Sequence, residues 1–259
     1  MTEQQWKIFC DFKEELKKQV QVWCDLAPEL RELQRAAAIA AKTPDYPFET
    51  TVVYNRALDE ITPEDDIRLI VIGDNPGKDE QLAKNNKYLV GQAGKIAEGY
   101  FKKNPCLNID FRKNVIILNK TPIHSAKTNQ LKTIAKQGGK KIADLIEESQ
   151  IWMAERTAKL HIDLCRAADS ESNQTELWLV GYSELKEKGI FGAYKNVLKS
   201  TYLLSSPETW EKVFVFQHFS MNRFPIDLNE YIRTENKEAQ SLEKTIHELG
   251  LKHKLEIFG

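Results

Sequence analysis

Four short runs of apolar residues stand out along the chain, at residues 67–72, 114–118, 177–180 and 213–216. Each run is almost uninterrupted by polar residues, which is typical of strands that are buried on both faces of a sheet. The pattern therefore predicts four central β-strands rather than strands with one face in water.

Segments of helical character lie between these runs, around residues 93–103, 131–168 and 182–203, and a last helix is expected over residues 227–253. Strands that alternate with helices favour a parallel sheet joined by right-handed crossovers. We expect an α/β fold, namely a three-layer α/β/α sandwich with a four-stranded parallel central sheet.

The first 42 residues carry apolar positions at mostly three- and four-residue steps, which predicts helix. Pro28 is expected to break this segment into a helical pair. Residues 43–63 are loop-like, although residues 51–54 could form a short edge strand. We find no repeat and no long linker, so residues 1–259 are expected to form a single domain with a helical N-terminal extension at 1–42.

Composition narrows the classes of function. The 259 residues include 37 Lys and Arg against 38 Asp and Glu, so any affinity for nucleic acid requires a local basic face. Neither a membrane-spanning run nor a secretory signal is apparent, so a cytoplasmic protein without membrane association is expected. The four cysteines are far apart in sequence and are expected to be buried thiols, with no metal site.

The segments that follow the strands are the places to search for chemistry, because ligands of open parallel sheets bind beyond the carboxyl ends of the strands. Polar residues gather in three of them, at 73–80, 119–124 and 217–223. If the sheet is parallel, these loops place Asp74, Asn75, Asn119 and His218 in a common cleft. The first loop has neither the spacing of a P-loop nor that of a dinucleotide-binding turn, which disfavours nucleoside triphosphate hydrolysis.

Four motifs in order resemble the uracil-DNA glycosylase superfamily. Residues 73–77 read Gly-Asp-Asn-Pro-Gly, and the superfamily has Gly-x-Asn-Pro-Gly or Gly-Glu-Ala-Pro-Gly there. Residues 88–95 read Tyr-Leu-Val-Gly-Gln-Ala-Gly-Lys, similar to Pro-Phe-Val-Gly-Arg-Ala-Gly-Lys/Gln of the thermostable bacterial and archaeal branch. Residues 115–119 are similar to the strand that ends in the uracil-pairing Asn, and residues 218–220 stand where the family has His-Pro-Ser or His-Pro-Ala.

The resemblance implies a DNA-repair enzyme that flips uracil, or a related deaminated or damaged base, out of DNA and hydrolyses its N-glycosidic bond without a cofactor. By resemblance, Asn75 or Asp74 positions the attacking water and His218 stabilises negative charge on the base oxygen. Asn119 offers one acceptor and one donor, which complement the N3–H and O4 edge of uracil. The remaining base-binding candidates by resemblance are Gly73, Pro76, Gly77, Tyr88 and Leu89.

The loop after His218 is the candidate DNA contact. Met221 or Phe224 could wedge the duplex where the base leaves, with Arg223 on a phosphate. Lys127 begins a basic cluster that continues through Lys132, Lys136, Lys140 and Lys141, and His124 is interpreted as a surface loop residue. The DNA-binding candidates are Ser220, Met221, Asn222, Arg223 and Lys127, and the expected partner of this monomer is DNA.

The chain also departs from the family pattern. Leu89 stands at the position of the stacking Phe, with Tyr88 one step before it, and Phe219 replaces the Pro of His-Pro-Ser. Cys10 and Cys24 lack the spacing of the iron–sulfur branch, so we expect no cluster. Two alternatives remain: a catalytically impaired protein of this fold that binds DNA or nucleobases, and a small-molecule enzyme that uses Asp74 and His218 as acid and base.

Overall fold

A central parallel sheet organises the computed structural model, which describes residues 1–170 and 174–259. Its four strands run in the order β2-β1-β3-β4, and every neighbouring pair is parallel. The four-stranded parallel sheet predicted from the apolar runs is thereby confirmed. The strands are β1 (Leu69–Gly73), β2 (Val115–Asn119), β3 (Glu176–Val180) and β4 (Val213–Phe216).

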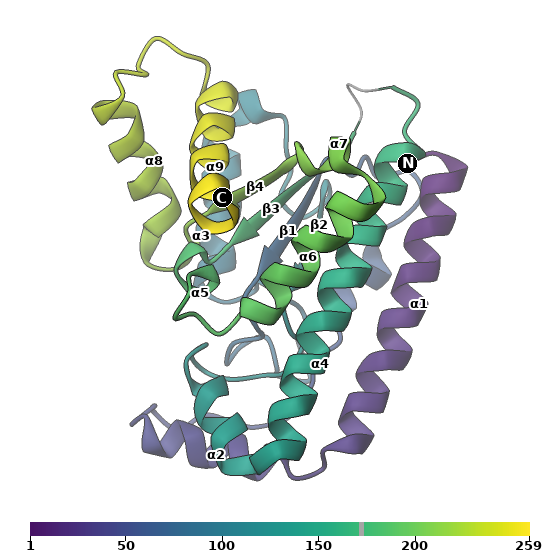
Figure 1. Ribbon diagram of the computed structural model, residues 1–259, viewed down its shortest axis with the longest axis vertical. Coiled ribbons are helices and arrows are strands. Elements are labelled where there is room, and N and C mark those ends of the chain that lie inside the picture. Colours follow the sequence, from purple (N-terminus) through teal and green to yellow (C-terminus); the bar gives the residue numbers. More distant parts are fainter. Residues whose placement is uncertain (171–173) are drawn as a thin grey trace.

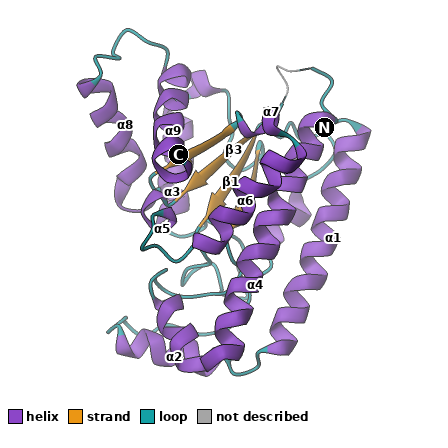
Figure 2. Cartoon of the chain, in the orientation of Figure 1, coloured by secondary structure: helices purple, strands orange, loops and turns teal. Residues whose placement is uncertain are grey.

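Helices cover both faces of this sheet, as Figures 1 and 2 show. The described α-helices are α1 (Glu3–Leu26), α2 (Leu30–Ala40), α3 (Gln92–Lys103), α4 (Gln130–Arg166), α5 (Tyr182–Leu185), α6 (Gly192–Ser205), α7 (Pro207–Trp210), α8 (Arg223–Thr234) and α9 (Leu242–Phe258). Short 3-10 helices lie at Arg56–Glu60 (η1), Pro105–Leu107 (η2) and Ser220–Asn222 (η4).

Alternating residues of each strand feed two separate hydrophobic cores. Ile70 and Ile72 of β1 pack into the core that contains residues of α1, α4 and α6. Leu69 and Val71 point the other way, into the core shared with α3, α8 and α9. Because side chains alternate between the faces of a strand, this division makes the molecule a three-layer α/β/α sandwich.

The N-terminal helical pair is also as predicted. Thr2 caps α1 through a capping box with Gln5, in which each side chain accepts from the other residue's backbone N–H. Phe9 and Leu16 of α1 are fully buried in the same core as the sheet. The extension at 1–42 therefore covers one face of the sheet, through contacts of α1 and α2 with α4.

Several boundaries differ from the sequence-based expectation. The expected helix at 227–253 is two helices, α8 and α9, because Asn236 takes a left-handed conformation and Ser241 caps a new helix. The expected helix at 182–203 is likewise divided into α5 and α6. Residues 51–54 contribute only an isolated antiparallel bridge between Val52 and Ile123.

The cysteines are less uniform than expected. Cys165 is buried, Cys10 and Cys24 are half-buried, and Cys106 is exposed. The expectation of four buried thiols is therefore confirmed for Cys165 alone, and it is wrong for Cys106, which lies in η2 on the surface. Among residues 1–170 and 174–259, no helix has both the length and the apolar character needed to cross a membrane.

Candidate functional site

A cavity of about 660 Å³ opens beyond the carboxyl ends of the strands, and we call it the strand-end cavity. The loops after all four strands line it, together with the first turn of α3. The chain leaves β1 through α3 on one face of the sheet and leaves the neighbouring β3 through α6 on the other, so the connections diverge between β1 and β3. Open α/β sheets bind ligands at such a switch point.

The structure brings most of the predicted site residues to this one cavity, although they come from distant parts of the chain. Gly73 at the end of β1, Pro76 in the following loop and Asn222 at the end of η4 lie nearby but do not line it. Those that do are Asp74, Asn75, Gly77, Leu89, Asn119, Lys127, His218, Ser220, Met221 and Arg223.

Asn75 is fixed in orientation by its amide nitrogen. Nδ2 donates to Ser125 Oγ at 2.9 Å and to the carbonyl oxygens of Ser125 and Pro76, both at 3.2 Å. Among the described residues, only Nδ2 of the Asn75 amide has hydrogen-bond partners. Oδ1 is therefore left as a hydrogen-bond acceptor for a molecule in the cavity.

Asp74 is held by Lys120, a residue that the sequence analysis missed. The fully buried Lys120 Nζ donates to Asp74 Oδ1 and to the Val180 carbonyl, both at 2.6 Å, and it lies 3.3 Å from the Gly73 carbonyl. Three acceptors match the three N–H bonds of an ammonium group. Burial lowers the pKa of Lys120, whereas the Asp74 carboxylate favours the charged form.

Gly181, directly after β3, allows Asp74 to take this position. Its φ of 98° is in the left-handed region, and a Cβ there would overlap the Asp74 carboxyl group. The sequence signals for both missed residues are local: a charged Lys120 continues an apolar strand, and a glycine ends the next one.

His218 is prepared to donate a hydrogen bond into the cavity. Its Nδ1 accepts from the backbone N–H of Ser220 at 3.1 Å and lies 2.8 Å from Ser220 Oγ. Burial lowers the pKa of His218 and Lys120 lowers it further, against the opposing effect of Asp74. A neutral ring whose Nδ1 accepts must carry its proton on Nε2, so Nε2–H is the donor.

Asn119 presents an unused buried donor. It ends β2 opposite Gly73 in register, and a Cβ on Gly73 would overlap Asn119 Oδ1. Asn119 Nδ2 is buried and has no hydrogen-bond partner among the described residues. An unmet buried donor costs about 1–3 kcal/mol, so a ligand that offers a carbonyl oxygen here would be favoured.

Leu89 forms an aliphatic side of the cavity and is locked in place. Its φ is 50°, and its N–H donates to Glu80 Oε1 at 2.9 Å. The second oxygen of the buried Glu80 accepts from the Gly77 N–H at 3.0 Å, so one carboxyl group ties two cavity-lining loops together. Burial raises the pKa of Glu80 to about 7, against the lowering effect of both N–H groups.

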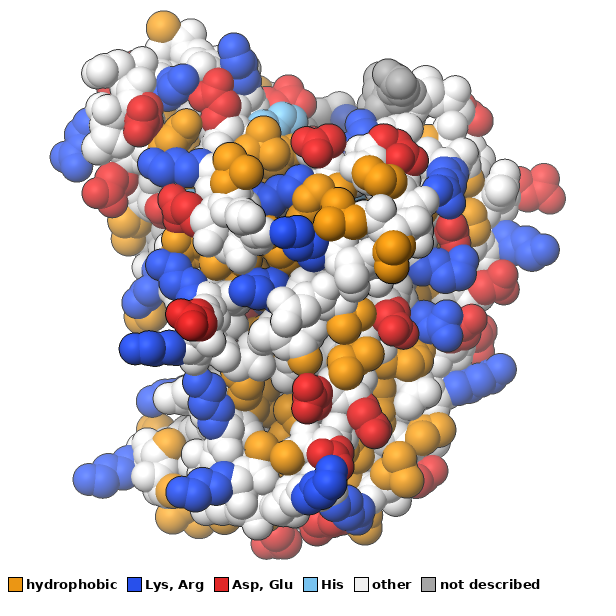
Figure 3. All heavy atoms as spheres, viewed as in Figure 1, with side chains coloured by type: hydrophobic (Ala, Val, Ile, Leu, Met, Phe, Trp, Pro, Cys, Tyr) orange, Lys and Arg blue, Asp and Glu red, His pale blue; other side chains and the backbone are white. Residues whose placement is uncertain are grey.

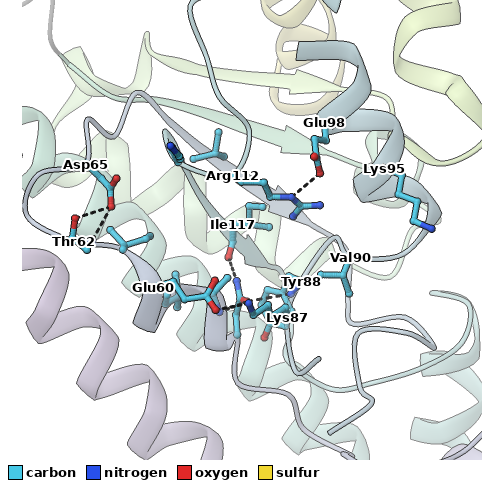
Figure 4. Close-up of a pocket in the computed structure, with 16 residues that line it drawn as sticks. Glu60, Thr62, Asp65, Lys87, Tyr88, Val90, Lys95, Glu98, Arg112 and Ile117 are labelled. Carbon is cyan, nitrogen blue, oxygen red and sulfur yellow. Dashed lines mark hydrogen bonds and ion pairs between the residues drawn. The ribbon is translucent and has the colours of Figure 1, made fainter. Parts of the chain in front are cut away.

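Tyr88 does not reach the strand-end cavity, contrary to its place among the base-contacting candidates. It lines a second cavity of about 520 Å³, which we call the β2-edge cavity because Val115 and Ile117 of the outer strand β2 form part of its wall (Figure 4). The Tyr88 hydroxyl donates to the Val53 carbonyl at 2.6 Å, and the side chain is fully buried. Of Tyr88 and Leu89, only Leu89 lines the strand-end cavity.

The two wedge candidates are separated by their exposure. Phe224 is fully buried and packs against the rings of Tyr100, Trp178 and Phe216. Met221 is 68% exposed and has a left-handed backbone with φ of 55° at the cavity rim. Only Met221 of the two can meet a ligand at this rim.

Phe219, which stands where the His-Pro-Ser motif has proline, is also fully buried, and its ring packs against Phe111 and Phe224. It anchors the backbone that carries His218 on one side and Ser220 on the other. The substitution therefore leaves a fixed loop, in which Ser220 holds the imidazole.

His124 is not a surface residue, so that interpretation is wrong. It is fully buried, its Nδ1 donates to the Pro76 carbonyl at 2.8 Å, and its Nε2 lies 3.0 Å from the Tyr46 hydroxyl. Burial lowers its pKa to about 4, so the ring is neutral at physiological pH. His124 supports the Asn75–Pro76 turn from behind.

The expected basic cluster is only partly available to an anion. Lys140 pairs with Asp144 at 2.6 Å and Lys141 with Glu29 at 2.6 Å, both beyond the kink of α4 at Gly139. Lys127 lines the strand-end cavity and Arg223 lies across its rim. In Figure 3, further Lys and Arg side chains project along the left side of the molecule, toward which the strands of Figure 1 point.

The described part of the chain contains no group of three or more His, Cys, Asp or Glu side chains arranged to hold a metal ion. Searches against protein-family models, curated proteins and solved structures give no match to the chain.

Proposed function

We propose that the protein is a DNA glycosylase that hydrolyses the N-glycosidic bond of uracil, or of a related deaminated or damaged base, after the base is flipped out of the strand. One observation carries the proposal. Asn75, Asn119 and His218 come from three separate loops and line the same cavity, where each offers an unused polar atom.

The proposed reaction needs a positioned water molecule and stabilisation of the charges that separate. Asn75 Oδ1 accepts a hydrogen bond from the water that attacks the sugar carbon. The Asp74 carboxylate, 2.6 Å from Lys120 Nζ, supplies negative charge where positive charge develops on the sugar.

The leaving base takes the electron pair of the broken bond, so negative charge develops on its O2 oxygen. The Nε2–H of neutral His218 donates to that oxygen. Because the ring is held through Nδ1 by the Ser220 N–H, the donor requires no reorganisation during the reaction. Removing one such donor typically costs about 10²–10³ in rate.

Asn119 accounts for the choice of base. Its free Nδ2 donates to the O4 carbonyl of uracil, and its Oδ1 accepts from N3–H. Cytosine presents an amino group in place of O4, so two donors would face each other. A buried mismatch of this kind gives strong discrimination.

The strand is held at the rim of the cavity. Met221 is the exposed apolar side chain that would occupy the space of the flipped base, and Arg223 of the same loop and Lys127 of the loop after β2 would contact phosphates. Flipping costs a few kcal/mol and costs less for a mispaired or single-stranded uracil.

The test is base release from oligonucleotides that contain one uracil, single-stranded or opposite guanine, followed by alkaline cleavage of the abasic sites. We expect cleavage by the wild-type protein and a loss of about 10²-fold or more in His218→Ala and in Asn75→Ala. Absence of cleavage at high enzyme concentration on both substrates would reject the activity.

A second candidate function is binding of DNA or nucleobases without catalysis. The observation that favours it is Leu89, which gives the cavity an aliphatic wall where an aromatic ring would stack on the base. Salt-dependent DNA binding with no release of uracil would identify this function.

A further inference from the structure

The N-terminal extension contributes a second surface feature beside the strand-end cavity. Helix α2 and the segment at residues 43–48 enclose a cavity of about 700 Å³. This segment lies outside residues 68–223, over which the family motifs occur. The cavity therefore belongs to a part of the chain for which the proposed function gives no role.

Two aromatic rings and two cations form a stack here. The rings of Tyr46 and Phe48 have centroids 4.2 Å apart at an angle of 34°. Lys78 Nζ lies 5.8 Å from the Tyr46 centroid, and Arg35 Cζ lies 5.7 Å from the Phe48 centroid. Rings this close leave no room for a cation between them, so the two cations take the outer faces. We call these four residues the cation–aromatic stack.

The stack is rigidly connected to the proposed catalytic loop. The Tyr46 hydroxyl lies 3.0 Å from His124 Nε2, and His124 Nδ1 donates to the Pro76 carbonyl. Lys78 follows that loop directly and itself lines the strand-end cavity. The stack therefore continues the wall of the strand-end cavity rather than forming a separate site.

Hydrogen bonds also fix the segment that carries the rings. Gln81 is fully buried, donates to the Pro47 carbonyl at 2.6 Å and accepts from the Glu49 N–H at 2.7 Å. At the other end, Gln130 donates to Thr43 Oγ1 at 2.8 Å. Because the segment is fixed at both ends, the two rings are held in place for the cations that lie against them, which lowers the entropic cost of binding.

The charges of the stack are largely available. Lys78 has no carboxylate partner within the described residues, and Arg35 meets only the exposed Glu32, at 3.4 Å. Asp45, the acid that lines the same cavity, accepts from the backbone N–H of Tyr46 at 3.0 Å. Cations held against aromatic faces and exposed to solvent are suited to phosphate groups.

We propose that the cation–aromatic stack binds the phosphodiester backbone of the DNA strand next to the flipped base, with Lys78 and Arg35 each on a phosphate. This inference rests on the proposed function for the identity of the strand. It extends the DNA contact from the rim at Arg223 and Lys127 to the N-terminal extension.

The test is the salt dependence of binding to a fluorescent single-stranded oligonucleotide without uracil, measured by anisotropy with the full chain. Each phosphate contact with single-stranded DNA contributes about 0.7 to the slope of log affinity against log salt. We expect Arg35→Gln to reduce the slope by about 0.7 and to weaken binding about fivefold at 0.1 M salt. Arg35→Gln with Lys78→Gln should reduce the slope by about 1.4.

Arg35→Gln is the decisive variant, because Arg35 does not line the strand-end cavity. Tyr46→Phe keeps the ring and should leave the slope unchanged. Lys18→Gln, on an exposed position of α1, controls for a general loss of positive charge. If the slope of log affinity against log salt for Arg35→Gln equals the slopes for wild type and for Lys18→Gln, the inference is overturned.

The two proposals fail in different ways. Suppose that Arg35→Gln reduces the salt slope but the wild-type protein releases no uracil. This result would support the DNA contact and reject the glycosylase activity. Uracil release with an unchanged slope would support the activity and reject the stack as a phosphate site.

Discussion

The strand-end cavity and the β2-edge cavity are similar in volume, but they differ in whether their polar groups already have partners. In the strand-end cavity, of about 660 Å³, Asn119 Nδ2 has no hydrogen-bond partner among the described residues, and the Ser220 N–H holds the His218 ring through Nδ1. In the β2-edge cavity, of about 520 Å³, Arg112 pairs with Glu98 (Figure 4), and the Tyr88 hydroxyl donates to the Val53 carbonyl. Lys87 and Glu60 form a further pair there.

The two cavities therefore differ little in volume. They differ in how many of their polar atoms are left to bond to a ligand. Polar groups that already satisfy one another have little to offer a ligand, and their bonds would have to break first. Unmet groups held in a fixed position gain from binding. We therefore interpret the charged pairs of the β2-edge cavity as structural and propose the strand-end cavity as the place where a ligand binds.

Replacing Lys120, under the strand-end cavity, is expected to change stability most. Lys120→Met leaves the Asp74 carboxylate and the Val180 carbonyl without their buried donor. Removing one partner of a buried pair typically destabilises a protein by about 3–5 kcal/mol. Urea denaturation should show that loss in the free energy of unfolding.

The double variant Lys120→Met with Asp74→Asn serves as the control, because it also removes the uncompensated charge. It should recover part of the stability but none of the proposed base release, which needs Asp74. Equal unfolding free energies for Lys120→Met and wild type would mean that the pair contributes nothing, and the role we give it would be wrong.

The next effect concerns Glu80, which ties Gly77 to Leu89. Its pKa of about 7 in the folded protein lies above the ordinary value of 4.5, so the folded state binds the proton more tightly. The stability from this proton is complete below pH 4.5 and is lost as the pH rises to 7. That loss amounts to roughly 3 kcal/mol, at 1.36 kcal/mol per pH unit.

Glu80→Gln should remove this pH dependence, since Gln imitates the protonated acid and cannot ionise. Urea unfolding between pH 4 and pH 8 measures it, as the difference between wild type and variant at each pH. The two proteins should diverge as the pH rises, and a constant difference over the whole range would contradict the assignment.

The fold was predictable to a large extent because its signals are local. Apolar runs marked all four strands within a few residues, since a strand buried on both faces has no polar position. The division between α8 and α9 was not predictable in the same way. It depends on the left-handed conformation of Asn236, which apolar spacing does not reveal.

The candidate site was predictable as a set of loops but not as a set of contacts. Parallel strands necessarily bring their carboxyl-terminal loops together, which is why Asn75, Asn119 and His218 share a cavity. The partners of these residues depend on packing across long sequence distances. Lys120 reaching Val180, and His124 buried under Pro76, are contacts of this kind.

The smallest effect is expected in the β2-edge cavity and tests the other half of the comparison. Glu60→Gln removes the partner of Lys87 in a pair whose side chains are 64% and 32% exposed. Exposed pairs contribute about 0–1 kcal/mol, because water solvates the separated charges almost as well. Unfolding should therefore change by less than about 1 kcal/mol, and DNA binding should stay at the wild-type value. A large loss of stability or of DNA binding in Glu60→Gln would show that this ion pair has more than a minor structural role. Polar atoms without partners would then not be enough to distinguish a binding cavity from a structural one.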